Sequence, residues 1–77
     1  METDLEVDAR GLLCPLPILR LARAFRRAPA GTVALLLATD PAAVEDVKVF
    51  CGEGGHELLS MDHHGNVFSF RVKKAES

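Results

Sequence analysis

One of the two cysteines in this sequence, Cys14, lies in the unusual stretch GLLCPLPIL at residues 11–19. Two prolines follow it, Pro15 directly and Pro17 two positions after that. Because position 17 is a proline, Cys14 has no second thiol with which to form a C-x-x-C redox pair. The thiolate is the nucleophilic form of cysteine and can attack a disulfide or a sulfane sulfur. From the residues alone, a packed structural cysteine and an exposed nucleophile fit this stretch equally well.

An amphipathic helix is predicted from Pro17 onward, which places Cys14 at or just before its first turn. Its apolar residues, at the spacing i, i+3, i+4, i+7, are Ile18, Leu21, Ala22 and Phe25. A helix N-terminus carries free N–H groups and a partial positive charge, which favour a thiolate. Because prolines lack an N–H, Leu16 N–H is expected to be the main donor left for the sulfur. The same prolines are expected to hold the sulfur in a fixed direction.

Four strands and a second helix complete the predicted fold. Strands are expected at 5–9, 32–38, 56–61 and 67–74, with a turn at 62–66. LEVDA and VFSFRVKK alternate with period two, as half-buried strands do, whereas TVALLLA is almost wholly apolar and indicates a central strand. The order β-α-β-α-β-β predicts an α/β two-layer sandwich, a four-stranded mixed sheet with two helices packed on one face. With 77 residues, the chain is expected to form a single domain over residues 1–77.

The second helix is predicted to start at TDP, residues 39–41. Thr39 or Asp40 can cap it, and Pro41 suits the first helical position. One face of this helix carries Val44, Val47 and Cys51. Its end is expected at the glycines Gly52, Gly54 and Gly55.

Right-handed crossovers would place both helices on the same face of the sheet, so both helices would start at one rim. Cys14 is therefore expected to share a rim with Asp40 and Pro41. About ten helical residues at roughly 1.5 Å each would place Cys51 on the order of 15 Å from that rim. A disulfide needs Cα atoms within about 7 Å, so Cys14 and Cys51 are not expected to pair. Cys51 is instead expected to be a small, buried hydrophobic residue.

The stretch LEVDARGLLCPLPIL resembles the TusA-like (SirA-like) family of small sulfur-carrier proteins. The family signature D-x-x-G-x-x-C-P-x-P is matched by Asp8, Gly11, Cys14, Pro15 and Pro17. ATDPAAVEDVKVFC is similar to the second-helix segment of the family, with Asp40, Pro41, Asp46 and Cys51 in register. GHELLSMDHHGNVFSFRVKK is similar to its terminal hairpin, so the resemblance covers nearly the whole chain.

The resemblance implies a β-α-β-α-β-β sandwich that acts as a sulfurtransferase by relaying a persulfide. Cys14 would accept a sulfane sulfur from a donor of the cysteine desulfurase or rhodanese type and pass it to an acceptor protein. The covalent persulfide would be its only cofactor, and a helix start would stabilise the anion. Members that serve tRNA thiolation often carry an acidic residue between the prolines, where this chain has Leu16. Sulfur oxidation, cofactor sulfuration and selenium-related delivery are therefore open alternatives.

Residues on both sides of Cys14 are expected to support it. The prolines Pro15 and Pro17 with Leu16 frame the sulfur, Arg10 and Gly11 lie on the loop before it, and Asp40 and Pro41 share its rim. Arg10 either steadies the persulfide anion or is an ordinary solvated arginine. Farther along the first helix, Arg20, Arg23 and Arg27 form a basic stripe with Arg26 nearby. This stripe is either a solvated face or a docking site for an acidic partner.

Composition narrows the other classes of function. A formal charge of −2 does not favour bulk binding to nucleic acid or membranes. An acidic start without an apolar run predicts no signal peptide, so a reducing cytoplasm is the expected location. No cysteine lies at ligand spacing from His56, His63 or His64, so no metal site is expected. Both faces of 32–38 are apolar, and the face away from the helices could bind a partner or a second copy, giving a monomer or a weak dimer.

Two alternatives to a sulfur carrier follow from the same cysteine. In the first, the chain is a non-catalytic interaction or regulatory module, and Cys14 is a structural cap that does not react with alkylating agents. In the second, Cys14 is a thiol redox switch that forms an intermolecular disulfide under oxidant.

Overall fold

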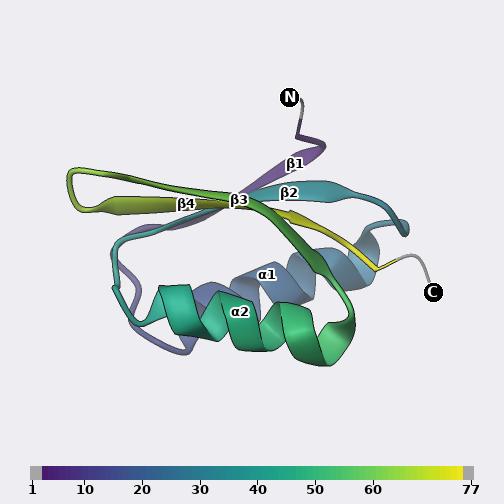
Figure 1. Ribbon diagram of the computed structural model, residues 1–77, viewed down its shortest axis with the longest axis horizontal. Coiled ribbons are helices and arrows are strands. Elements are labelled where there is room, and N and C mark those ends of the chain that lie inside the picture. The colour runs from purple at the N-terminus through teal and green to yellow at the C-terminus, as the bar shows by residue number, and fades with distance from the viewer. Residues whose placement is uncertain (1–2, 76–77) are drawn as a thin grey trace.

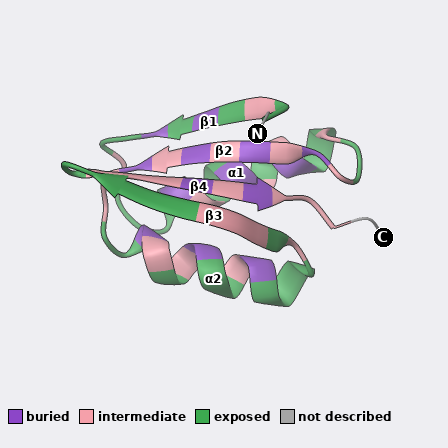
Figure 2. Ribbon diagram, turned by 45° about the horizontal axis from the view of Figure 1, so that its top comes forward, coloured by how far each residue is buried: buried purple, intermediate pink, exposed green. Residues whose placement is uncertain are grey.

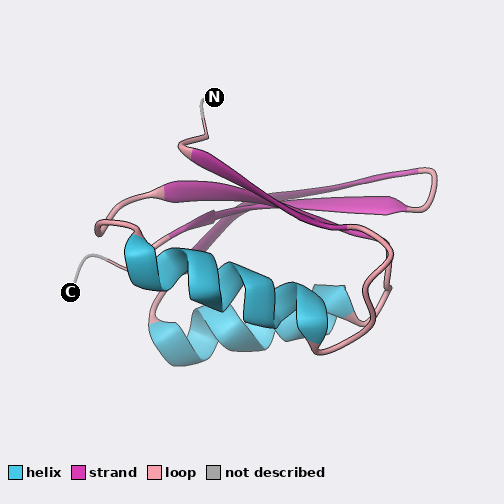
Figure 3. Cartoon of the chain, turned by 180° about the vertical axis from the view of Figure 1, so that it is seen from behind, coloured by secondary structure: helices cyan, strands magenta, loops and turns pink. Residues whose placement is uncertain are grey.

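A computed structural model describes residues 3–75 as one sheet and two helices. In chain order the elements are β1 (Leu5–Ala9), α1 (Leu16–Arg27), β2 (Val33–Ala38), α2 (Ala43–Gly54), β3 (Glu57–His64) and β4 (Val67–Lys73). The order of strands and helices is the one that the sequence predicts. Both helices lie against the same face of the sheet, and the other face is uncovered (Figure 1). Seen from behind, the two helices run side by side beneath the strands (Figure 3).

The sheet has the order β1-β2-β4-β3. β2 pairs in parallel with β1 and antiparallel with β4, and β4 pairs antiparallel with β3, so the sheet is mixed. The predicted central position of the apolar strand is confirmed, since β2 has a neighbour on each side. β1 and β3 are the two edge strands.

The core lies between the sheet and the helices. Along β2, Ala34, Leu36 and Ala38 are buried toward the helices, whereas the alternate residues are half-buried on the open face (Figure 2). α1 contributes Leu21 and Phe25. The rest of the buried apolar core is Val7, Ala9, Ala43, Val47, Cys51, Phe70 and Val72. This asymmetry between the faces follows from the two-residue period of a strand, because only one set of side chains can meet the helices.

α2 begins later than the sequence predicts. Pro41 and Ala42 form a turn, and the helix starts at Ala43. Asp40 organises this turn, because its Oδ1 accepts a hydrogen bond from Ala42 N at 3.0 Å and its backbone O accepts one from Ala43 N at 2.9 Å. Pro41 is therefore not the first helical residue. At the other end, Gly52 is still helical, and Gly55 ends the helix in a left-handed conformation with φ of 73°.

The hairpin between β3 and β4 is longer than predicted. Asp62 and His63 were expected in a turn, but they pair with Ser69 and Phe68 as strand residues. The His63 ring stacks on Phe68 with ring centroids 4.0 Å apart, which extends the pairing toward the tip. The turn itself is reduced to Gly65 and Asn66, and Gly65 supplies the positive φ that a two-residue hairpin loop requires.

Candidate functional site

Cys14 lies exposed on the loop that joins β1 to α1. Its backbone N–H donates a hydrogen bond to Asp40 Oδ2 at 2.7 Å. The same carboxylate binds Ala42 N through its other oxygen, so one side chain ties the Cys14 loop to the start of α2. The expected shared rim of Cys14 and Asp40 is thus present. Pro41, the next residue, is exposed in the turn that precedes α2.

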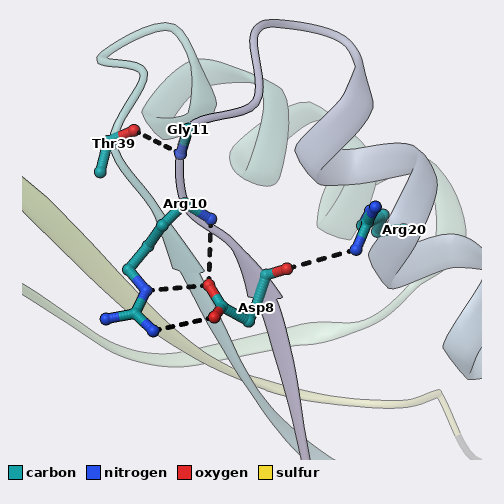
Figure 4. Close-up of polar contacts among 5 residues, drawn as sticks. All are labelled: Asp8, Arg10, Gly11, Arg20 and Thr39. Atoms are coloured by element: carbon teal, nitrogen blue, oxygen red, sulfur yellow. Dashed lines mark hydrogen bonds and ion pairs between the residues drawn. The ribbon is translucent and has the colours of Figure 1, made fainter.

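A second hydrogen bond fastens the start of this loop. Gly11 N donates a hydrogen bond to Thr39 Oγ1 at 2.9 Å (Figure 4). Thr39 is the residue before Asp40, which binds Cys14 N. Gly11 has φ of 82°, a conformation that residues with a side chain rarely adopt. The segment from Gly11 to Cys14 is therefore held at both ends by the residues that follow β2.

The first turn of α1 differs from the expectation for the sulfur. Leu16 N donates to Leu13 O at 2.8 Å, so the predicted donation of this N–H to the sulfur is wrong. Pro15 occupies the N-cap position, and the Cys14–Pro15 peptide bond is cis. Pro17 is buried in the core, whereas Pro15 and Leu16 are exposed beside Cys14. The two prolines therefore have different surroundings, one in the core and one at the surface.

Acidic groups determine the electrostatics of the thiol. Hydrogen bonding with Asp46, followed by desolvation and then by the charges of Asp46 and Asp40, raises the pKa of the Cys14 thiol above its ordinary value. The expectation that the helix start would favour the thiolate is not met, because hydrogen bonding with Asp46, desolvation and the nearby carboxylate charges all favour the protonated thiol. Among residues 3–75, Asp46 Oδ2 is a buried oxygen for which no other hydrogen-bond partner is present.

Arg10, on the loop before Cys14, pairs with Asp8. Its Nε and Nη2 donate to the two carboxylate oxygens of Asp8 at 2.9 and 2.8 Å, and its backbone N donates to Asp8 Oδ1 at 3.1 Å (Figure 4). The hydrogen bonds with Arg10 lower the pKa of Asp8 from its ordinary value of 3.8 to about 2. Arg10 is exposed, with 53% of its side chain accessible, which agrees with the interpretation of a solvated arginine. In this position it forms a local ion pair with Asp8 of the signature.

Exposed apolar side chains lie on the segments around Cys14. Leu13 is 71% exposed on the same loop, and Leu16 and Leu19 are about half exposed on α1, at 47% and 54%. On α2, Val49 is 55% exposed and lines a small groove together with Pro15 and Asp46. Leu16 was expected from the sequence to frame the sulfur, whereas Leu13, Leu19 and Val49 were not identified as part of the site. Large exposed apolar groups gathered in one region are typical of a surface that contacts another protein.

Residues 5–74 match the family model described as sulfurtransferase TusA. The chain belongs to this family. It is 42% identical over 94% of its length to a sulfur carrier protein TusA of Allochromatium vinosum, covering 95% of that relative. It is 35% identical to the putative sulfur carrier protein YrkI of Bacillus subtilis, over 96% of the chain and 99% of the relative. The solved SirA-like protein of Desulfitobacterium hafniense has a TM-score of 0.80 at 20% identity, covering 94% and 99% of the two chains, and supports the fold.

In this TusA-family chain, the arginine stripe lies away from the sulfur. Arg20, Arg23 and Arg27 line a groove between α1 and β1, and Cys14 is not among its residues. Arg20 Nη1 donates a long hydrogen bond of 3.5 Å to the backbone O of Asp8. Arg26 is on a different side of α1, in a hollow with Phe50 and His56.

Cys51 and His56 both take part in packing away from Cys14. Cys51 is a free, buried cysteine in the core, as predicted, and desolvation raises its pKa. His56 Nδ1 accepts a hydrogen bond from Ala75 N at 2.9 Å, and its ring stacks on Phe50. Within residues 3–75, no three side chains of histidine, cysteine, aspartate or glutamate gather as a metal site. In the same range, neither helix has the length and apolar character needed to cross a membrane.

Proposed function

We propose that this chain is a sulfur carrier, in which Cys14 accepts a sulfane sulfur as a persulfide from one protein and passes it to another. The observation that carries the proposal is the exposed thiol of Cys14 on a rim that Asp40 fixes in place. The names of its TusA-family relatives support the same role. A relay needs a sulfur that a second protein can approach, and exposure meets that need.

Each transfer is an exchange between sulfur atoms without net oxidation. In loading, the Cys14 thiolate attacks the terminal sulfur of the donor's persulfide, a new S–S bond forms, and the donor cysteine leaves as a thiolate. In delivery, a nucleophile of the acceptor attacks the outer sulfur on Cys14, and Cys14 leaves as a thiolate. The step requires no metal and no cofactor other than the sulfur that Cys14 carries.

The acidic surroundings of Cys14 give the unloaded carrier a protonated, less nucleophilic thiol. Asp46 and Asp40 raise the pKa of the thiol. The higher pKa also slows oxidation, because the thiolate is the form that reacts with oxidants. A donor that brings cationic groups to these two carboxylates would lower the thiol pKa on docking. A partner of the cysteine desulfurase or rhodanese type, in the cytoplasm, is the proposed donor.

The exposed leucines provide a contact surface next to the reacting sulfur. Leu13 directly precedes Cys14 and is largely exposed, and Leu16, two residues after Cys14, is about half exposed. Burial of their apolar surface by a partner would stabilise a complex and exclude water from the sulfur. Because Leu16 is about half exposed two residues from Cys14, its side chain would be among the first groups that a partner meets.

Persulfide loading tests this function directly. The purified protein is incubated with a rhodanese-type enzyme and thiosulfate, and peptides are analysed by mass spectrometry without reductant. The expected product carries one added sulfur on the peptide that contains Cys14. Cys51→Ser is the matched control and should load like the wild type, because Cys51 is buried. Cys14 as a structural cap predicts no loading and a thiol that resists alkylation.

A further inference from the structure

The outer edge of β1 is open in the part of the chain that the structure describes. β1 is the first strand in the sheet order and pairs only with β2 (Figure 2). The free side of an edge strand presents backbone N–H and C=O groups that can pair with another extended chain. On this strand, the Asp8 carbonyl accepts a 3.5 Å hydrogen bond from Arg20 (Figure 4). A bond of that length is weak and easily replaced.

A basic groove lies directly beneath this edge. Arg20, Arg23 and Arg27 line it with the backbone segment from Leu5 to Asp8, around a volume of about 490 Å³. None of these three arginines forms an ion pair with any residue from 3 to 75. The whole chain has a formal charge of −2, so this cluster of positive charge is local. The groove thus offers cations without an ion-pair partner in the described chain beside the free edge of a strand.

The alternation of β1 specifies the chemistry of a strand added beside it. Leu5, Val7 and Ala9 point toward the helices, and Glu6 and Asp8 point to the open face. Side chains of an added strand would alternate in the same way. One set would face the arginines, and the other set would lie next to Glu6 and Asp8. Acidic residues at every second position, separated by neutral or basic ones, satisfy both environments.

A second copy of the chain does not fit this pattern. In a two-fold antiparallel pairing of β1 with β1, like faces align, so Leu5, Val7 and Ala9 of the copy would lie on the side of the arginines. Glu6 and Asp8 would then lie beside the same acidic residues of the copy, which is unfavourable.

We propose that the edge of β1 binds an extended, alternately acidic segment of a protein partner, which adds a strand to the sheet and contacts Arg20, Arg23 and Arg27. Backbone hydrogen bonds would give affinity, and the arginines would select the sequence. The groove excludes Cys14, so a bound segment would leave the sulfur accessible. Binding here does not depend on Cys14 carrying sulfur.

Synthetic peptides test the sequence pattern. The probe is a fluorescein-labelled peptide of alternating glutamate and threonine, compared with an isomer in which the same glutamates are contiguous. Fluorescence anisotropy should show at least about tenfold tighter binding of the alternating peptide, a difference of about 1.4 kcal/mol. Binding should weaken as salt rises, and N-methylation of alternate backbone amides of the peptide should abolish it. Equal affinity for the two isomers would overturn the proposal.

Variants of the protein locate the binding surface. Arg23→Glu should reduce affinity for the alternating peptide about tenfold or more, whereas Arg26→Glu should not. The second variant is the matched control, with the same charge change on the same helix but outside the groove. Cys14→Ser should bind like the wild type, which separates this result from the sulfur chemistry. In NMR spectra, the peptide should shift and protect the amides of residues 5–9. An equal effect of both arginine variants, unchanged β1 amides, or a dimer that forms through β1 would contradict the proposal.

Discussion

At the scale of single residues, Cys14 is controlled by carboxylates that lie far from it in the sequence. The sequence predicts that Cys14 precedes a helix, and a helix start predicts a favoured thiolate. In the structure, Leu16 N–H donates its hydrogen bond to Leu13 O, and Asp46 and Asp40 raise the pKa of the thiol. Asp46 is in register with the second-helix segment of the family, yet only the packing of α2 beside α1 brings it to the sulfur. Local sequence therefore predicts the place of the thiol, and tertiary packing decides its ionisation.

Asp46→Asn should lower the pKa of Cys14, because it removes both the hydrogen bonding and the charge that favour the protonated thiol. The rate of alkylation by iodoacetamide, measured from pH 6 to 10, reports this pKa. The midpoint of the profile should move to lower pH, and alkylation near neutral pH should become faster. Glu53→Gln is the matched control, since Glu53 lines the same groove without contributing to the shift. An unchanged or raised midpoint in Asp46→Asn would refute the role of Asp46.

At the scale of elements, the start of α2 and the end of β3 differ from the positions that the local sequence predicts. The residues TDP predict a helix start at Pro41. In the structure, the Asp40 carboxylate accepts hydrogen bonds from both Cys14 N and Ala42 N, and the helix begins only at Ala43. The turn residues at 62–66 suggest a loop, but pairing with β4 carries β3 to His64. Both differences arise because a contact with another element competes with a local preference. The elements themselves were predictable, since their apolar periodicity comes from one shared core.

Asp40→Ala should loosen the Cys14 loop and lower the thermal unfolding midpoint, because Cys14 N and Ala42 N both lose their acceptor. These hydrogen bonds lower the pKa of Asp40 below its ordinary value of 3.8. Their contribution to stability is therefore present above that value and is lost as the pH falls through the lowered pKa. Unfolding measured between pH 2 and 7 should show a weaker acid dependence in the variant. Hydrogen exchange at the Cys14 amide should also become faster.

Asp62→Ala provides the comparison, because Asp62 is an exposed aspartate on β3 for which no side-chain hydrogen bond is present within residues 3–75. Its thermal midpoint and Cys14 amide exchange should stay close to those of the wild type. If Asp40→Ala behaves like Asp62→Ala in both measurements, the Asp40 bridge does not hold the loop.

At the scale of the whole molecule, the sheet has one covered face and one open face, and this asymmetry organises the protein. The covered face holds the core, the rim at one end presents Cys14, and the free edge of β1 lies beside the arginines of α1. The sequence predicts the two layers from the order of elements. It does not predict which face of β2 meets the helices, because Leu35 and Leu36 are equally apolar and only the packed structure distinguishes them.

Leu36→Ala and Leu35→Ala form a matched pair for this asymmetry. Leu36 is fully buried toward the helices, so its truncation should cost about 2–5 kcal/mol in free energy of unfolding. Leu35 is half-buried on the open face, and the same change should cost about 1 kcal/mol. Urea denaturation followed by circular dichroism measures both values. Equal losses would mean that the two faces are covered to the same extent.

A labelled-sulfur relay measures whether Cys14 carries sulfur from one protein to another. The protein is loaded by a cysteine desulfurase with isotopically labelled cysteine, separated from the donor, and mixed with a candidate acceptor protein that has an exposed cysteine. We expect the label on the Cys14 peptide and then on the acceptor as it leaves Cys14, in Cys51→Ser as in the wild type. Transfer by Cys14→Ser at the wild-type level, or release of all the label as free sulfide, would contradict it.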